Sequence, residues 1–272
     1  MSTALLKPIA VAKPWGVMDM PPPFAAQGNR VGEIWFDPPP GASLLVKYLF
    51  TSQKLSVQVH PDDAAARAAG AERGKEECWY IVAAEPGAQI AVGTKRPLSD
   101  EELAFAASNG ELEDQLQWHP AEPGGFFHIP PGTIHAIGPG IELIEIQQNS
   151  DITYRLFDYG RPRALHIAEA VAAARAEPMR AAQYRRADGQ SARLLDGPAF
   201  GVALLCGDDR HGLPREARAG AVIPLSGSAA LGRLLLAPGQ CGWTENIGEV
   251  ALGGGGQCLV AWAPGEAAGP LE

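Results

Sequence analysis

Short runs of β-branched and aromatic residues, separated by glycine and proline, recur along most of the chain. Residues 43–50, 77–82 and 142–148 are three such runs, each of a length typical of one β-strand. The chain has 32 glycines and 24 prolines among 272 residues, which is high for a helical protein and suits a fold with many turns. The sequence therefore predicts an all-β fold in which helices are confined to short segments.

Three segments depart from this pattern and are expected to form short helices. Residues 62–69 and 165–176 are rich in alanine, a strong helix former. Ser99 and Glu102 have the spacing of a capping box, in which each residue satisfies a backbone N–H of the other at a helix start. We therefore expect a helical insert at about 97–118 that lies between strands and covers one end of a barrel.

The strand-like runs fall into two groups along the chain. We expect a catalytic β unit at 1–176, which carries the helical insert, and a smaller β unit stacked with it at 177–272. Residues 1–31 look irregular. The glycine run 253–256 is expected to be a flexible turn, because no helix follows it to complete a phosphate-binding loop.

Charge and cysteine usage limit the partners and the compartment. The 22 basic and 31 acidic residues give a net charge of -9, which argues against nucleic acid as a main partner. Residues 1–14 lack the apolar core of a signal peptide, and no apolar run approaches the length of a membrane span, so we expect no membrane association. The four cysteines form no CxxC pair, so a reducing cytoplasm is the expected compartment.

Four polar residues in separate strand-like runs have the chemistry of metal ligands. Gln58 and His60 are two residues apart in an apolar/polar alternation, so both would point to the same face of a strand. Glu77 opens a second run, and His135 ends the Pro-Pro-Gly-Thr-Ile-His segment at 130–135. Two imidazoles, a carboxylate and an amide oxygen make a plausible ligand set for zinc or a neighbouring first-row metal.

The order of these ligands resembles the cupin pattern. In that pattern a histidine ends one strand, a glutamate lies on the next, and a Pro-x-Gly-x-x-His segment such as 130–135 follows later. A small jelly-roll β-barrel brings such distant segments together at one mouth. The spacing alone is compatible with several metal cupin functions.

Five segments, in the same order, resemble the type I mannose-6-phosphate isomerases in their short bacterial form. The resemblance covers roughly residues 13–165, and the last hundred residues match more loosely. The matching segments are 32–35, 55–63, 74–80, 131–136 and 147–155. The resemblance implies a cupin fold and reversible interconversion of mannose 6-phosphate and fructose 6-phosphate, with a sugar phosphate as the small-molecule partner.

The same resemblance implies which residues would form the site. It assigns Gln58, His60, Glu77 and His135 as the metal ligands, with one zinc per chain as the usual metal. A neutral amide ligand such as Gln58 leaves the metal a stronger Lewis acid than a fourth anionic ligand would.

Further residues in the matching segments are candidates for contact with substrate. Arg155 matches the family's active-site arginine and would stabilise an enediolate, while Glu145 is the candidate acid/base. Lys75 shares the strand face of Glu77 and is a candidate catalytic and substrate-contacting residue. Ser56, on the face of Gln58, and Arg161 are candidate substrate-binding residues.

Two alternatives come from other functional classes. An iron-dependent cupin oxygenase usually holds its metal with a histidine/carboxylate set, and Gln58 and the Gly-Lys-Glu-Glu motif at 74–77 argue against it. A non-catalytic sugar-binding cupin is the second alternative. The presence of Arg155 and Lys75 beside a complete ligand set argues against that reading, because a binding module needs no Lewis acid.

Overall fold

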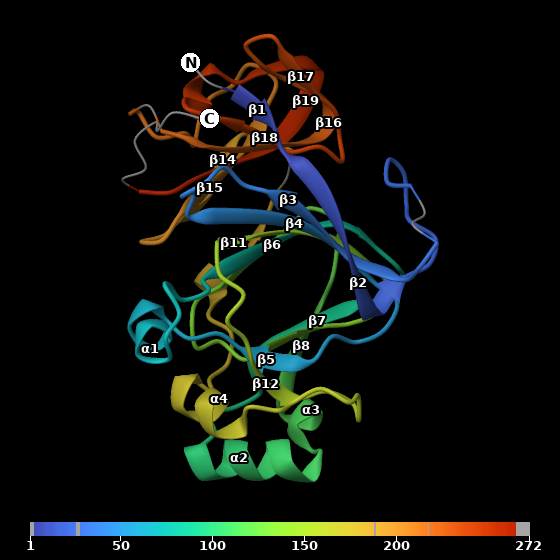
Figure 1. The fold of residues 1–272 in the computed structure, drawn as a ribbon, viewed down its shortest axis with the longest axis vertical. Coiled ribbons are helices and arrows are strands. Elements are labelled where there is room, and N and C mark those ends of the chain that lie inside the picture. The colour runs from blue at the N-terminus through green and yellow to red at the C-terminus, as the bar shows by residue number, and fades with distance from the viewer. Residues whose placement is uncertain (1–2, 26–27, 188, 217, 265–272) are drawn as a thin grey trace. The chain divides into compact units, whose positions relative to one another are not determined.

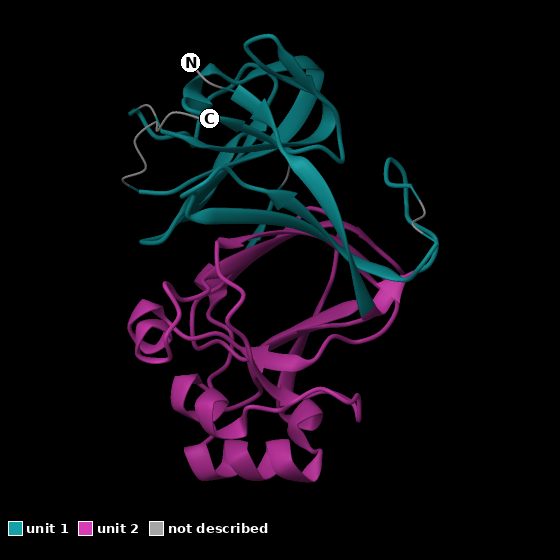
Figure 2. Ribbon diagram, in the orientation of Figure 1, with its two compact units in different colours: residues 1–13, 18–48, 185–272 teal, residues 14–17, 49–184 magenta. Residues whose placement is uncertain are grey.

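The computed structural model describes residues 3–25, 28–187, 189–216 and 218–264, which are built mainly from β-strands (Figure 1). The chain forms two compact units (Figure 2). The first comprises residues 1–13, 18–48 and 185–272, and the second comprises residues 14–17 and 49–184. The mainly β fold expected from the sequence is confirmed.

The second unit contains two groups of antiparallel strands. In the five-stranded sheet the strand order is β12 (Tyr154–Phe157), β5 (Val57–Val59), β10 (His135–Ile137), β7 (Gln89–Thr94) and β8 (Leu116–Pro120). In the other group the neighbours are, in order, β9 (Gly125–Ile129), β6 (Glu77–Ala84) and β11 (Ile141–Gln148).

A buried apolar cluster joins the two groups of strands face to face. Trp79 and Leu143 come from one group, and Ile90 and Ile137 come from the other. These side chains alternate along their strands with residues of the opposite face, as a strand's period of two requires. The first residues of β6 and β10, Glu77 and His135, are polar and lie at the edge of this cluster.

The helices at 100–109, 112–115 and 167–173 lie over the outer face of the five-stranded sheet, whereas the helix at 63–68 does not contribute to this packing. A second cluster packs Val57 and Ala136 of that sheet against Leu103 and Ala170 of two helices. The helices are α1 (Asp63–Ala68), α2 (Asp100–Asn109), α3 (Leu112–Gln115) and α4 (Ile167–Ala173). The insert therefore covers a sheet face, and the expectation that it covers a barrel end is wrong. None of the described helices has the length and apolar character that crossing a bilayer requires.

The start of α2 has the predicted capping box. The Glu102 N–H donates to Ser99 Oγ at 3.2 Å, and the Ser99 N–H donates to Glu102 Oε2 at 2.8 Å. Gly110 ends the helix with a φ of 83°, a left-handed conformation that glycine adopts without steric cost. The helix expected from this motif is confirmed.

The first unit is built around a sheet of long strands. The order is β1 (Thr3–Leu5), β18 (Gly242–Thr244), β16 (Gly220–Leu231), β19 (Ala251–Trp262), β15 (Gly201–Cys206) and β14 (Ala192–Asp196), with β17 (Leu234–Leu236) paired to β16. Strand β3 (Val31–Asp37) and the 3-10 turn η2 (Ile247–Glu249) also belong to this unit. Strands β2 (Lys7–Val17), β4 (Leu44–Thr51) and β13 (Tyr184–Arg186) contain residues of both units, and the 3-10 turn η1 (Ala181–Gln183) belongs to the second.

The expectation that residues 1–31 are irregular is wrong. This segment contains β1 and β2, and β1 pairs with β18, where Thr3 lies opposite Thr244. The pairing explains why the segment joins the C-terminal strands in one unit, whereas the sequence suggested a boundary near residue 176. Much of β2 is exposed and it contains Pro8 and Pro14, so it lacks the apolar alternation that reveals a strand.

The glycine run 253–256 lies inside β19 and does not connect two strands. Gly254 and Gly255 have φ values of 62° and 68°, and the register between β16 and β19 shifts near Ser226 and Ser228. Glycine tolerates this conformation, which bends a strand without ending it. The expected turn is therefore an irregularity within one long strand.

Candidate metal centre

Three strands of the second unit bring the predicted metal-ligating side chains together. His60 follows β5, Glu77 opens β6 and His135 opens β10. One ligand atom from each residue lies within 4.8 Å of the others. The three residues are 2 %, 0 % and 1 % exposed. Two imidazole nitrogens and a carboxylate oxygen that converge on one buried point are the donor types that zinc and its first-row neighbours prefer, so this arrangement suits a metal ion.

Backbone carbonyl groups orient both imidazole rings. His60 Nδ1 donates to the Ile152 carbonyl oxygen, and His135 Nδ1 donates to the Thr133 carbonyl oxygen, each at 2.9 Å. A carbonyl only accepts, so each ring carries its proton on Nδ1 and directs the lone pair of Nε2 at Glu77. The Nε2 atoms of His60 and His135 lie 3.4 and 3.5 Å from the Glu77 carboxylate oxygens. Such outer hydrogen bonds are typical of metal-ligating histidines.

Burial keeps His135 neutral. It lowers the pKa of His135 from 6.5 to about 4. A neutral imidazole is the form that binds a metal ion, because its free nitrogen lone pair is available. The donor set of two imidazoles and one carboxylate therefore fits the zinc ion that the sequence resemblance implies.

Gln58 lies beside the set with its amide nitrogen facing it. Across the sheet it is opposite His135, and its Nε2 is 3.2 Å from His135 Nε2. Its Oε1 accepts a hydrogen bond from the buried Ser56 hydroxyl at 3.2 Å. A half-turn of the amide would exchange the two atoms and aim the oxygen at the imidazoles. The structure thus places Gln58 and Ser56 at the site, with Gln58 in the orientation that donates to His135.

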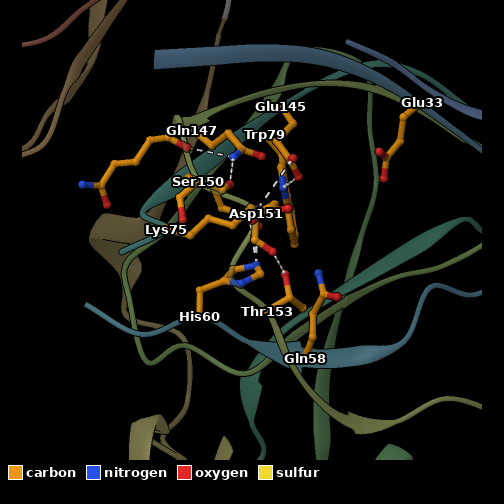
Figure 3. Close-up of polar contacts among 12 residues, drawn as sticks. Glu33, Gln58, His60, Lys75, Trp79, Glu145, Gln147, Ser150, Asp151 and Thr153 are labelled. Atoms are coloured by element: carbon orange, nitrogen blue, oxygen red, sulfur yellow. Dashed lines mark hydrogen bonds and ion pairs between the residues drawn. The ribbon is translucent and has the colours of Figure 1, made fainter. Parts of the chain in front are cut away.

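A buried lysine and a second carboxylate lie beside the set, and Figure 3 shows Lys75 and Glu145 together with His60 and Gln58. Lys75 Nζ donates to Glu77 Oε2 and is 3.3 Å from His60 Nε2. The same ammonium is 3.7 Å from Glu145 Oε1. Lys75 and Glu145 are 4 % and 5 % exposed. Two carboxylates therefore share one buried cation within a few ångströms of the candidate ligands.

Trp79 fixes the orientation of Glu145. The two residues are directly opposite each other on β6 and β11, and Trp79 Nε1 donates to Glu145 Oε2 at 3.2 Å. Trp79 is fully buried, and its indole N–H is nevertheless paired at the site. Its position two residues after Glu77, on the same strand face, is the sequence signal that would have indicated this further contact.

Arg155 lies next to Gln58, on the neighbouring strand β12. Burial lowers its pKa, and the nearby cation Arg163 lowers it further. Among the described residues, its guanidinium group forms no ion pair, and its Nε is buried without a hydrogen-bond acceptor. A partly desolvated cation of this kind is available to bind an anionic ligand.

Asp158 forms ion pairs with two other arginines, Arg161 and Arg163, and among the described residues none with Arg155. It is 3 % exposed and accepts from Arg161 Nη1 at 3.0 Å and from Arg163 Nε and Nη2 at 2.6 Å each. Arg161 also donates to the Lys54 carbonyl oxygen at 2.7 Å, so its guanidinium group is held within this loop network. Asp158 and Arg163 were not predicted from the sequence, although acidic and basic residues concentrated at 158–163 are a visible signal.

No protein-family model matches the chain. The mannose-6-phosphate isomerase of Streptococcus mutans serotype c is 46% identical over 134 residues, which cover 47% of this chain and 42% of that protein. The mannose-6-phosphate isomerase ManA of Bacillus subtilis strain 168 is 44% identical over 135 residues, again 47% of this chain and 42% of that protein. The matched stretch is therefore less than half the length of either curated relative.

Solved structures resemble the chain over nearly its full length. The crystal structure of the mannose 6-phosphate isomerase from Bacillus subtilis covers 96% of this chain and 99% of its own, with a TM-score of 0.76 and 23% identity. A zinc-bound mannose 6-phosphate isomerase structure covers 97% and 100%, with a TM-score of 0.68 and 16% identity. The resemblance predicted from the sequence is confirmed. The chain has the cupin-like fold of these isomerases.

Proposed function

We propose that the chain is a zinc-dependent isomerase that interconverts mannose 6-phosphate and fructose 6-phosphate. The observation that carries the proposal is the convergence of His60, Glu77 and His135 on one buried point. Their neighbours include a half-buried, unpaired arginine, and relatives and structural neighbours bear the name of this activity. Neither alternative function accounts for all of these features.

His60, Glu77 and His135 would hold the zinc ion, and Gln58 would complete the set after rotation of its amide. The bound ion would act as a Lewis acid towards substrate oxygens. The Nδ1 hydrogen bonds of His60 and His135 to backbone carbonyls hold both rings in the ligating tautomer before the metal arrives. Thus the chain supplies a preorganised site.

Glu145 is the proposed acid/base. Isomerisation removes the proton from C2 and delivers one to C1, while a hydroxyl proton moves from O2 to O1. Glu145 is held by Trp79 on one oxygen and faces Lys75 with the other, so its carboxylate has a fixed direction. Lys75 would contact the substrate oxygens and return protons to them.

Arg155 would stabilise the negative charge that develops on the enediolate. Its guanidinium is charged and partly desolvated, and among the described residues it forms no direct ion pair, although the nearby Asp158 carboxylate attracts it. Ser56, beside Gln58, and Arg161, in the loop after β12, are the other proposed substrate contacts. The expected cytoplasmic location and the expected lack of nucleic-acid and membrane partners stay predictions.

A coupled assay on metal-analysed protein tests this function directly. Fructose 6-phosphate formed from mannose 6-phosphate is measured with and without chelator, and zinc is then restored. We expect about one zinc per chain and turnover that chelator abolishes and zinc restores. Bound zinc without turnover of hexose phosphates would support the sugar-binding alternative, and bound iron with oxygen uptake would support the oxygenase.

A further inference from the structure

A cavity of about 210 Å³ lies in the second unit on the other side of the loop that precedes β10. Its lining includes His128, Thr133, Arg175, Glu177, Arg180 and Gln183. None of the candidate metal ligands lines it. It is therefore a separate concave site, and the proposed isomerase chemistry does not use it.

The cavity has more cationic than anionic groups. Arg175 is exposed, and within the described residues its guanidinium forms no ion pair or hydrogen bond. Arg180 pairs with Glu177 at 3.3 Å, which offsets that one carboxylate. His128 Nε2 is 2.8 Å from Glu76 Oε1, so its ring is anchored at the cavity wall. Arg175 is thus the uncompensated charge of the cavity.

Two neutral hydrogen-bonding residues, Thr133 and Gln183, share the lining with this charge, together with four apolar residues. Thr133 contributes a hydroxyl group to the lining, and the Gln183 amide is fixed by donating to the His128 carbonyl oxygen at 3.3 Å. A planar guanidinium matches two oxygens of a phosphate at once, and hydroxyl and amide groups serve the remaining oxygens. We propose that this cavity binds a small phosphate-type anion at a second site, distinct from the metal centre.

The loop behind the cavity connects this second site to the candidate metal ligands. The Arg175 N–H donates to the Gly132 carbonyl oxygen at 2.7 Å, and the Gly132 N–H donates to the His60 carbonyl oxygen at 2.8 Å. The next residue, Thr133, provides the carbonyl that orients His135. Gly132 has a φ of 86°, and a Cβ there would lie 3.0 Å from the Ala173 carbonyl oxygen, so the loop is closely packed.

This connection makes the second site regulatory. An anion bound by Arg175 holds this residue, and through its N–H the Gly132 carbonyl, in the position that supports the His60 backbone and the Thr133 carbonyl that orients His135. Anion binding therefore tightens zinc binding, and zinc tightens anion binding by the same factor. The second site itself does not depend on the isomerase proposal, whereas its coupling to zinc rests on the zinc site of the proposed function.

Binding of inorganic phosphate to zinc-loaded protein, measured by calorimetry, tests the site. The Arg155→Ala variant is the background, because it removes the unpaired arginine next to the metal centre. We expect Arg175→Ala in that background to raise the Kd for phosphate about tenfold, as loss of a bidentate contact does. Arg233→Ala removes an exposed arginine of the first unit and should leave the Kd unchanged.

Two further results decide the proposal. Arg180→Ala is a second test that leaves Arg175 in place, and we expect it to weaken phosphate binding about threefold. Equal phosphate affinities in the background, Arg175→Ala and Arg180→Ala proteins would overturn the second site. The Kd for zinc is then measured by competition with a chelator, with and without phosphate. We expect phosphate to lower this Kd severalfold in the background protein and to leave it unchanged in the Arg175→Ala protein. A zinc Kd that phosphate does not change in the background protein would overturn the coupling.

Discussion

Lys75 donates a hydrogen bond from its ammonium group to Glu77, the carboxylate that also lies between the Nε2 atoms of His60 and His135. A divalent ion bound by these three residues would lie within a few ångströms of that ammonium. Because both are cations in a buried setting, they repel each other strongly. In the absence of metal, Lys75 compensates the buried charge of Glu77.

Lys75→Met should bind zinc more tightly and lose turnover. The substitution keeps the apolar stem, removes the cation that opposes the metal and leaves Glu77 less well compensated in the metal-free protein. We expect about tenfold tighter zinc in a chelator competition and at least hundredfold slower isomerisation. Lys95→Met, a change at an exposed lysine, is the matched control. Weaker zinc binding in Lys75→Met would show that the lysine supports the metal site.

His135→Ala should lose metal and activity together. The change removes one of two imidazole ligands and leaves a cavity beside Glu77, so zinc affinity should fall by at least two orders of magnitude. The metal content of purified protein and the coupled assay measure the two effects. His119→Ala, which removes a half-buried histidine of β8, should keep both. Full zinc stoichiometry in His135→Ala would contradict its assignment as a ligand.

Arg155→Ala should keep the metal and lose turnover by orders of magnitude. Its guanidinium is not among the candidate ligands, and its proposed contact forms with the enediolate. Zinc content should therefore stay at one per chain while kcat falls. Arg155→Lys keeps a charge without the planar fork and should recover part of the loss. If Arg155→Ala turned over at the normal rate, the residue would be structural.

The three side chains that converge in the candidate metal centre could be identified from the sequence because each lies in a short local motif. The two-residue spacing of Gln58 and His60 and the Pro-x-Gly-x-x-His pattern that ends at His135 are features of single strands and turns. The groups that orient the imidazoles could not be predicted. They are the carbonyls of Ile152 and Thr133, and every residue type has a carbonyl.

Long-range pairing limited the prediction of the fold. The strand β1 was missed because its partner β18 lies near the other end of the chain, and a local apolar pattern carries no information about such a partner. The capping box of Ser99 and Glu102 was found because all of its atoms belong to four consecutive residues. The orientation of the Gln58 amide depends on Ser56 and His135 together, so only the folded structure reveals it.

Asp158→Asn should reduce both stability and turnover. The carboxylate is buried and accepts three hydrogen bonds from Arg161 and Arg163, so its loss leaves two cations without their counterion next to Arg155. We expect urea unfolding to show a loss of about 2–3 kcal/mol. We also expect kcat to fall more than tenfold with zinc content unchanged. Wild-type stability and kcat would mean that Asp158 does not organise the arginines.

Glu142 should make the protein less stable as pH rises from acid to neutral. Burial raises its pKa from 4.5 to about 7, so between these values the folded state binds more protons than the unfolded state. Stability therefore falls across this window as pH increases.

The side chain is partly exposed, and solvent screening reduces the effect to about 1–2 kcal/mol. Glu142→Gln should be more stable than the wild type at pH 8 by that amount and equally stable at pH 4, as measured by urea unfolding. Glu169→Gln, a change on the exposed face of α4, should leave the wild-type pH profile intact. An identical profile in Glu142→Gln would show that Glu142 is charged in the folded protein without cost.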